Sequence, residues 1–149
     1  MTKHGTVLLI ENDADDVALI KRAFAEAEVM QPVHSVTNYK DAVAFLSGEG
    51  TYANRVAFPF PFLILLNLSM PREDGYAVLR WLYERPGLRK RFTVVVMHPG
   101  GPDQDVQLAY ELGAQSYLLK PLEHKALVAT IRRLKEYWVE LNLLPGEPA

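Results

Sequence analysis

The sequence predicts an α/β protein, a doubly wound five-stranded parallel sheet with five helices on its two faces. Two observations predict this fold. Short apolar runs, typical of strands covered on both faces, alternate along the chain with longer segments whose apolar residues recur at helical spacing. Parallel strands need right-handed crossover connections, so the intervening helices must cover both faces of the sheet.

The expected strands are short, apolar and bounded by Pro, Gly or polar residues. The first is "TVLLI" at residues 6–10, and a weaker candidate follows at 33–37. Three more runs complete the sheet, at residues 62–66, 92–97 and 116–119. In such a sheet, functional side chains gather where the carboxyl ends of the strands meet.

The first expected helix has an apolar face and an acidic start. Its apolar face consists of Val17, Ile20, Phe24 and Ala27. Acidic residues are favoured near the positive end of the helix dipole, and three occupy this one: Asp13, Asp15 and Asp16. We expect Asp13 to cap the helix rather than to serve in a site.

Four further apolar stripes predict the remaining helices. They centre on residues 42–46, 76–83, 106–112 and 127–138, and the first three are followed by Gly48, Pro86 and Gly113 as stop signals. The last stripe continues through Trp138 to Leu141, which leaves apolar surface to cover. We therefore expect a homodimer through the last helix and tail.

Composition restricts the class of protein. The length of 149 residues and the 49% hydrophobic content suit one domain, which we place at residues 1–141. With 16 basic and 18 acidic residues the net charge is −2, so nucleic acid is not an expected partner. Cysteine is absent and no apolar run is long enough for a signal peptide or a membrane span, so we expect a cytoplasmic protein with no membrane partner.

Two stretches depart from the alternating pattern. Residues 49–61, "EGTYANRVAFPFP", form a long connection whose aromatic residues either fold back over the core or contact a partner. Residues 142–149, "NLLPGEPA", are expected to be a frayed tail.

Polar side chains follow four of the five predicted strands. Because the carboxyl ends of parallel strands meet at one edge, we expect these residues to lie close together. They are Glu11, Asn12 and Asp13 after the first strand, Asn67 after the third, His98 after the fourth, and Lys120 with Pro121 after the fifth.

Four motifs at this edge resemble the receiver domains of two-component response regulators. They are "LLIENDADD", "LLNLSMPREDG", "VVVMHPG" and "YLLKP", in the order and spacing of that family. The stretches "GEGTYANRVAFPFPFLILL" and "EYWVELNLLP" look like the single-domain receivers associated with bacterial and cyanobacterial phytochromes. The resemblance implies a flavodoxin-like (βα)5 fold, a signalling role rather than an enzymatic one, and a sensor histidine kinase, possibly a phytochrome, as partner.

The resemblance also implies roles for individual residues. In receivers an aspartate after the third strand takes a phosphoryl group, and Mg²⁺ is held by acids of the first strand, by that aspartate and by a backbone carbonyl two residues later, here that of Ser69. Three positions depart from this pattern: Asn67 at the phosphoacceptor, Asn12 in the acidic pair and His98 at the switch Ser or Thr. Three positions match it: Lys120, which would contact the phosphate, Pro121, and the aromatic switch residue Tyr117.

These departures predict a degenerate site, that of a pseudo-receiver. An amide carries no formal charge and its nitrogen is a poor nucleophile, so Asn67 should not accept phosphate. With Glu11 as the only carboxylate of the acidic pair and Lys120 opposing it, Mg²⁺ should bind weakly or not at all, and the two residues are expected to form an ion pair. The alternative is a working receiver whose phosphoacceptor is a nearby group such as Ser69, His98 or Asp13.

Overall fold

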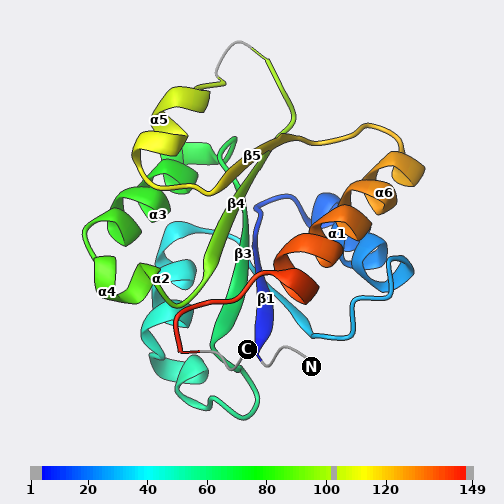
Figure 1. The fold of residues 1–149 in the computed structure, drawn as a ribbon. Coiled ribbons are helices and arrows are strands. Elements are labelled where there is room, and N and C mark those ends of the chain that lie inside the picture. The colour runs from blue at the N-terminus through cyan, green and yellow to red at the C-terminus, as the bar shows by residue number, and fades with distance from the viewer. Residues whose placement is uncertain (1–4, 102–103, 147–149) are drawn as a thin grey trace.

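Five parallel strands form a single sheet in the order β2-β1-β3-β4-β5 (Figure 1). The computed structural model describes residues 5–101 and 104–146. All five predicted strands are present within one or two residues of their expected bounds: β1 Thr6–Ile10, β2 Val33–Val36, β3 Pro61–Asn67, β4 Thr93–His98 and β5 Ser116–Leu119. The doubly wound parallel sheet is thus confirmed.

The described part of the chain contains six α-helices, one more than predicted. The additional one is the single turn α4, which begins at Pro86, where we had expected only a stop signal. Proline suits the first turn of a helix, because its missing N–H would have no intrahelical acceptor there. The helices are α1 Ala14–Glu26, α2 Tyr39–Ser47, α3 Asp74–Tyr83, α4 Pro86–Arg89, α5 Val106–Glu111 and α6 His124–Leu134.

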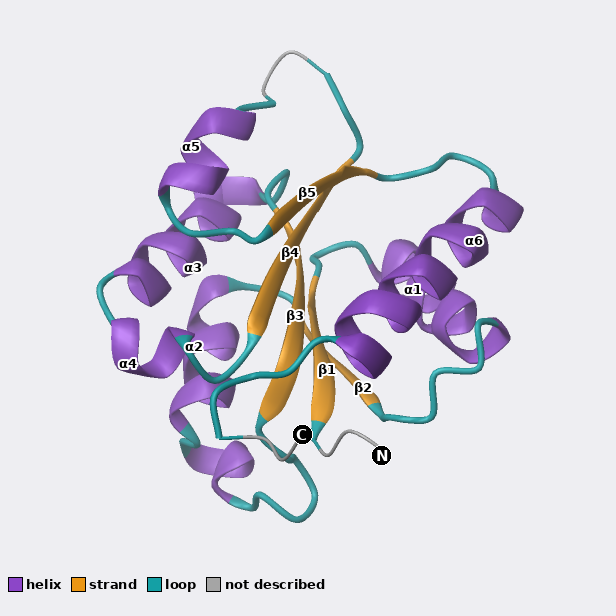
Figure 2. Cartoon of the chain, in the orientation of Figure 1, coloured by secondary structure: helices purple, strands orange, loops and turns teal. Residues whose placement is uncertain are grey.

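The helices form two layers with the sheet between them. Helices α1 and α6 cover one face, and α2, α3, α4 and α5 lie on the other (Figure 2). Successive residues of a strand point to opposite faces, so β1 gives Leu8 and Ile10 to one buried cluster and Val7 and Leu9 to the other. In the described residues no helix has the length and apolar character needed to cross a bilayer.

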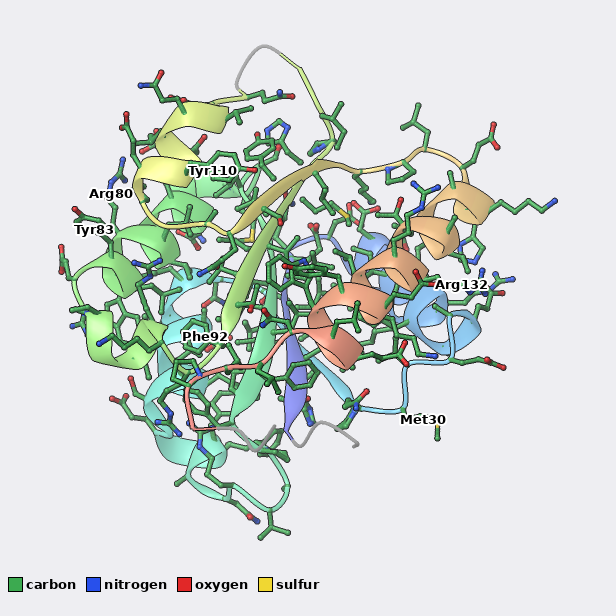
Figure 3. The ribbon with its side chains drawn as sticks, in the orientation of Figure 1. Met30, Arg80, Tyr83, Phe92, Tyr110 and Arg132 are labelled. Atoms are coloured by element: carbon green, nitrogen blue, oxygen red, sulfur yellow. The ribbon has the colours of Figure 1, made fainter. Side chains whose placement is uncertain are left out.

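The long connection at residues 49–61 folds back over the core. It contains a short 3₁₀ helix, Gly50–Ala53, and its rings pack on α2: Tyr52 lies 4.9 Å from Phe45 and 5.1 Å from Phe58 between ring centroids. Phe60 contacts Phe92, which is labelled in Figure 3, at 5.9 Å. The first of the two predicted alternatives therefore accounts for these aromatic residues.

The last helical stretch of the chain extends beyond α6. Helix α6 continues directly into a π-helical segment, Lys135–Leu141, in which Val139 is buried. Beyond it, the backbone N–H of Asn142 donates to the carbonyl of Tyr137, and Leu144 packs against the same core cluster as α1 and α6. Residues 142–146 form no helix or strand, and Leu143 is 56% exposed although Leu144 packs on the core. The frayed tail at residues 142–149 therefore stays a prediction, and residues 147–149 lie outside the described part.

Candidate functional site

The site lies where the carboxyl ends of the strands meet. A small cavity of about 40 Å³ there has four polar lining residues, supplied by three strand ends and one helix, and otherwise apolar walls. Glu11 follows β1, Asn67 ends β3, Lys120 follows β5, and Asp16 belongs to the first turn of α1. As expected, Glu11, Asn67 and Lys120 come together from the ends of three different strands.

Asn67 uses both ends of its amide within the protein. Its Nδ2 donates to Oε1 of Glu11 at 3.0 Å, and its Oδ1 accepts from the backbone N–H of Ser69 at 2.9 Å. The second bond closes a tight turn immediately after β3. The amide therefore holds the β3–α3 loop in place while it contacts the carboxylate of β1.

Glu11 is a nearly inaccessible carboxylate, only 3% exposed. Burial raises its pKa above the ordinary value, and the nearby negative charge of Asp16 acts in the same direction. Hydrogen bonds from the backbone N–H of Asp13, at 3.1 Å, and from Asn67 oppose the rise, and so does the positive charge of Lys120. Two neutral donors thus satisfy one oxygen of Glu11.

Lys120 pairs with Asp16, not with Glu11. Its Nζ contacts Oδ1 of Asp16, and the two side chains are 18% and 36% exposed. The predicted Glu11–Lys120 ion pair is wrong, because Oε1 of Glu11 accepts from Asn67 and from a backbone N–H, while Asp16 lies within direct reach of the ammonium.

Asp16 is the site residue that sequence reasoning missed. The sequence pattern indicates for it only a place in the acidic start of the first helix. A usable signal was present, because Asp16 precedes buried Ile20 by four residues, which places both on the face of α1 that packs on the sheet.

The predicted metal-binding set is divided between two hollows. Asn12 is exposed and lines, with Ser69, a separate open hollow of about 460 Å³. Glu11 and Asn67 belong to the small cavity instead. Asp13 caps α1 as expected, since its side chain accepts from the backbone N–H groups of Asp15 and Asp16.

His98 is buried at the end of β4, with 1% exposure. Its Nδ1 accepts from the backbone N–H of Gly100 at 2.8 Å, and its ring stacks on Tyr117 with centroids 6.1 Å apart. Its carbonyl also accepts from the backbone N–H of Lys120 at 2.8 Å. The imidazole thus helps to shape the turn after β4 and lies against the predicted aromatic switch residue.

The β3–α3 loop is tightly constrained. Gly75 of α3 packs closely against the backbone at the end of β3, because a Cβ there would lie 2.6 Å from the carbonyl oxygen of Asn67. Arg72 and Glu73 have φ of 59° and 57°, in the left-handed region that favours glycine. Asp74 accepts from the backbone N–H of Tyr39 at 3.0 Å, which ties the start of α3 to the start of α2.

The strand order, the polar edge and the lysine after β5 define a class of signalling domain. The family model of the response regulator receiver domain matches residues 7–132, and the chain belongs to this family. It is a receiver domain of the two-component signalling type.

Individual relatives cover nearly the whole chain. Response regulator Rcp1 of Synechocystis is 32% identical over 140 residues, which span 94% of this chain and 92% of Rcp1. The probable methanogenesis regulatory protein FilR2 of Methanothrix harundinacea is 32% identical over 143 residues, 94% of this chain and 87% of FilR2.

Solved structures of phytochrome-associated regulators are similar as well. The phosphorylated cyanobacterial phytochrome response regulator RcpA has a TM-score of 0.83 at 31% identity, and covers 97% of this chain and 100% of its own. RPA3017, from red light signalling of R. palustris, has a TM-score of 0.87 at 28% identity and the same two coverages. The Mn²⁺-bound form of Rcp1 has a TM-score of 0.80 at 30% identity and covers 96% of this chain and 100% of its own.

Proposed function

We propose that the chain is a pseudo-receiver, a signalling module that keeps the receiver fold, does not accept phosphate at residue 67, and acts by binding other proteins rather than as an enzyme. One observation carries the proposal. The side chain presented at the end of β3 is the amide of Asn67, and both of its polar atoms are hydrogen-bonded within the protein. A neutral amide engaged in this way lacks the ionised oxygen that attacks phosphorus.

The contacts of two neighbouring groups weigh against them as substitute phosphoacceptors. Asp13 accepts two backbone N–H groups as the cap of α1, and Nδ1 of His98 accepts from Gly100. Phosphorylation at Oδ1 of Asp13 or at Nδ1 of His98 would break these contacts.

The donor set does not fit the Mg²⁺ of ordinary receivers. Mg²⁺ takes hard, charged oxygen ligands and gives up its water reluctantly. Glu11 accepts from two donors, Asp16 is neutralised by Lys120, and Asn12 lies outside the cavity. We propose that Mg²⁺ binds weakly or not at all; the Mn²⁺ complex belongs to the relative Rcp1.

Incubation with acetyl phosphate and Mg²⁺, followed by intact-mass measurement, tests the proposal. The wild-type chain is expected to show no phosphate adduct. The triple variant Asn12→Asp, Asn67→Asp, His98→Thr restores the receiver residues and is the positive control. A wild-type adduct of one phosphate, mapped to any residue, would overturn the proposal.

The partner we propose is a cytoplasmic sensor histidine kinase, possibly a phytochrome. The similarity to RcpA and RPA3017, whose names refer to phytochrome and red light signalling, supports this choice. Capture of the purified kinase encoded nearest to this chain, with the unrelated kinase of another system as control, would separate a signalling module from a scaffold.

We also propose a homodimer formed through α6, the π-helical segment and residues 142–146. Three apolar side chains in this region are exposed: Tyr137 by 55%, Leu141 by 73% and Leu143 by 56%. The three lie close together in the sequence, and they expose apolar surface that a second copy would cover.

A further inference from the structure

The Asp16–Lys120 pair separates two cavities. One is the 40 Å³ cavity that contains Asn67 and Glu11. The other, of about 210 Å³, lies between α1 and the start of α6, where Leu122 and Leu127 form part of its wall. Asp16, Pro99 and Lys120 line both, so the ion pair lies with Pro99 at the boundary between them.

Each charged group at this edge has a partner of suitable chemistry. Lys120, the cation of the small cavity, contacts the carboxylate of Asp16. Glu11 is satisfied by two neutral donors, the amide of Asn67 and a backbone N–H. An ammonium that is largely removed from water needs such a carboxylate, because an unpaired buried charge is costly.

We infer that Asp16 is the carboxylate that holds Lys120 in place at an edge where residue 67 is an amide. This inference rests on the proposed function, since it explains how the lysine is held when residue 67 is an amide. The backbone N–H of Lys120 is bonded to His98 of β4, and its side chain is bonded to α1. Asp16 is therefore a positioning residue that fixes the β5–α6 loop against α1.

Acetylation of lysines in the full chain tests the inference. Limited treatment with an N-hydroxysuccinimide acetate ester, followed by peptide mass spectrometry, gives the rate at Lys120 relative to exposed Lys40. Only an unpaired, accessible amine attacks the ester readily, so Asp16→Asn and Asp16→Ser should raise the relative rate at Lys120 several-fold. Asp16→Glu keeps a carboxylate, so its relative rate at Lys120 should stay nearer that of the wild type. Asp15→Asn removes the same charge from an exposed neighbour and should leave the relative rate at Lys120 unchanged.

Two results would overturn the inference. One is an unchanged Lys120 rate in both neutral Asp16 variants, each shown by circular dichroism to be folded. The other is an increase in Glu11→Gln as large as in Asp16→Asn, which would make Glu11 the partner. The assay uses neither phosphate nor metal, so a phosphorylated wild-type chain would contradict the proposed function and leave this result standing on its own.

Discussion

Asn67 and Glu11 lie 56 positions apart in the sequence, yet the amide of one donates to the carboxylate of the other at 3.0 Å. This contact joins the carboxyl ends of β1 and β3, which are neighbours in the sheet. It needs an N–H donor on residue 67 and an acceptor oxygen on residue 11.

Asn67→Asp should destabilise the fold at neutral pH. The substitution replaces the Nδ2 donor by an oxygen that faces Oε1 of Glu11, so a hydrogen bond becomes a contact between like charges. We expect a loss of about 1–3 kcal/mol in the free energy of unfolding at pH 7, measured by urea denaturation. The exposed Asn12→Asp is the matched control, and equal effects of the two substitutions would contradict the role given to the contact.

Glu11→Gln should change how stability depends on pH. Since burial raises the pKa of Glu11, the folded chain binds its proton more tightly than the unfolded chain, and wild-type stability falls as the pH rises from the ordinary value of 4.5 through the folded pKa. Glutamine keeps the acceptor for Asn67 and carries no charge, so this fall should disappear. Urea denaturation from pH 4 to 8 measures it, and parallel curves for the two proteins would count against the prediction.

Gly75→Ala should lower the stability of the fold. The added methyl group would lie 2.6 Å from the oxygen of Asn67 and 2.7 Å from Cα of Leu68, both backbone atoms of the site. We expect a loss of about 1–3 kcal/mol, measured by thermal unfolding. Gly87→Ala is the matched control, because a Cβ there meets nothing within 4 Å and alanine favours the helical conformation.

The proposed homodimer predicts that Leu141→Ser weakens self-association. Leu141 is 73% exposed at the end of the π-helical segment, so serine removes apolar surface with little effect on the fold. Sedimentation equilibrium should show a dissociation constant raised about tenfold or more, the equivalent of roughly 1.4 kcal/mol. Met30→Ser is the control, since Met30 is 83% exposed on the loop between α1 and β2 (Figure 3). A monomeric wild-type chain at all concentrations would rule out the dimer.

The strands were predictable because each is a short apolar run, a local pattern that predicts a strand whatever its tertiary contacts. The start of β5 at Ser116 and its end at Leu119 agree with the sequence reading. The pairing of Lys120 was not predictable in the same way, since Glu11 and Asp16 are both near it and the choice depends on which carboxylate the neutral donors occupy.

The separation of Asn12 from Glu11 was not predictable from the sequence either. Adjacent residues at a strand end can face different hollows, and only the path of the following loop decides which. The packing of Leu144 likewise depends on residues distant in the sequence, those of the core cluster of α1 and α6. Tertiary packing, rather than local preference, determines each of these features.

The left-handed backbone of Arg72 and Glu73 has a consequence for recognition. Non-glycine residues in this conformation hold about 1 kcal/mol or more of conformational energy each. Both residues are exposed, and Glu73 lines the open hollow that contains Asn12, Ser69 and Tyr76. A binding partner that lets the two residues return to ordinary torsion angles would gain affinity from that release, in addition to what it gains from the area it covers.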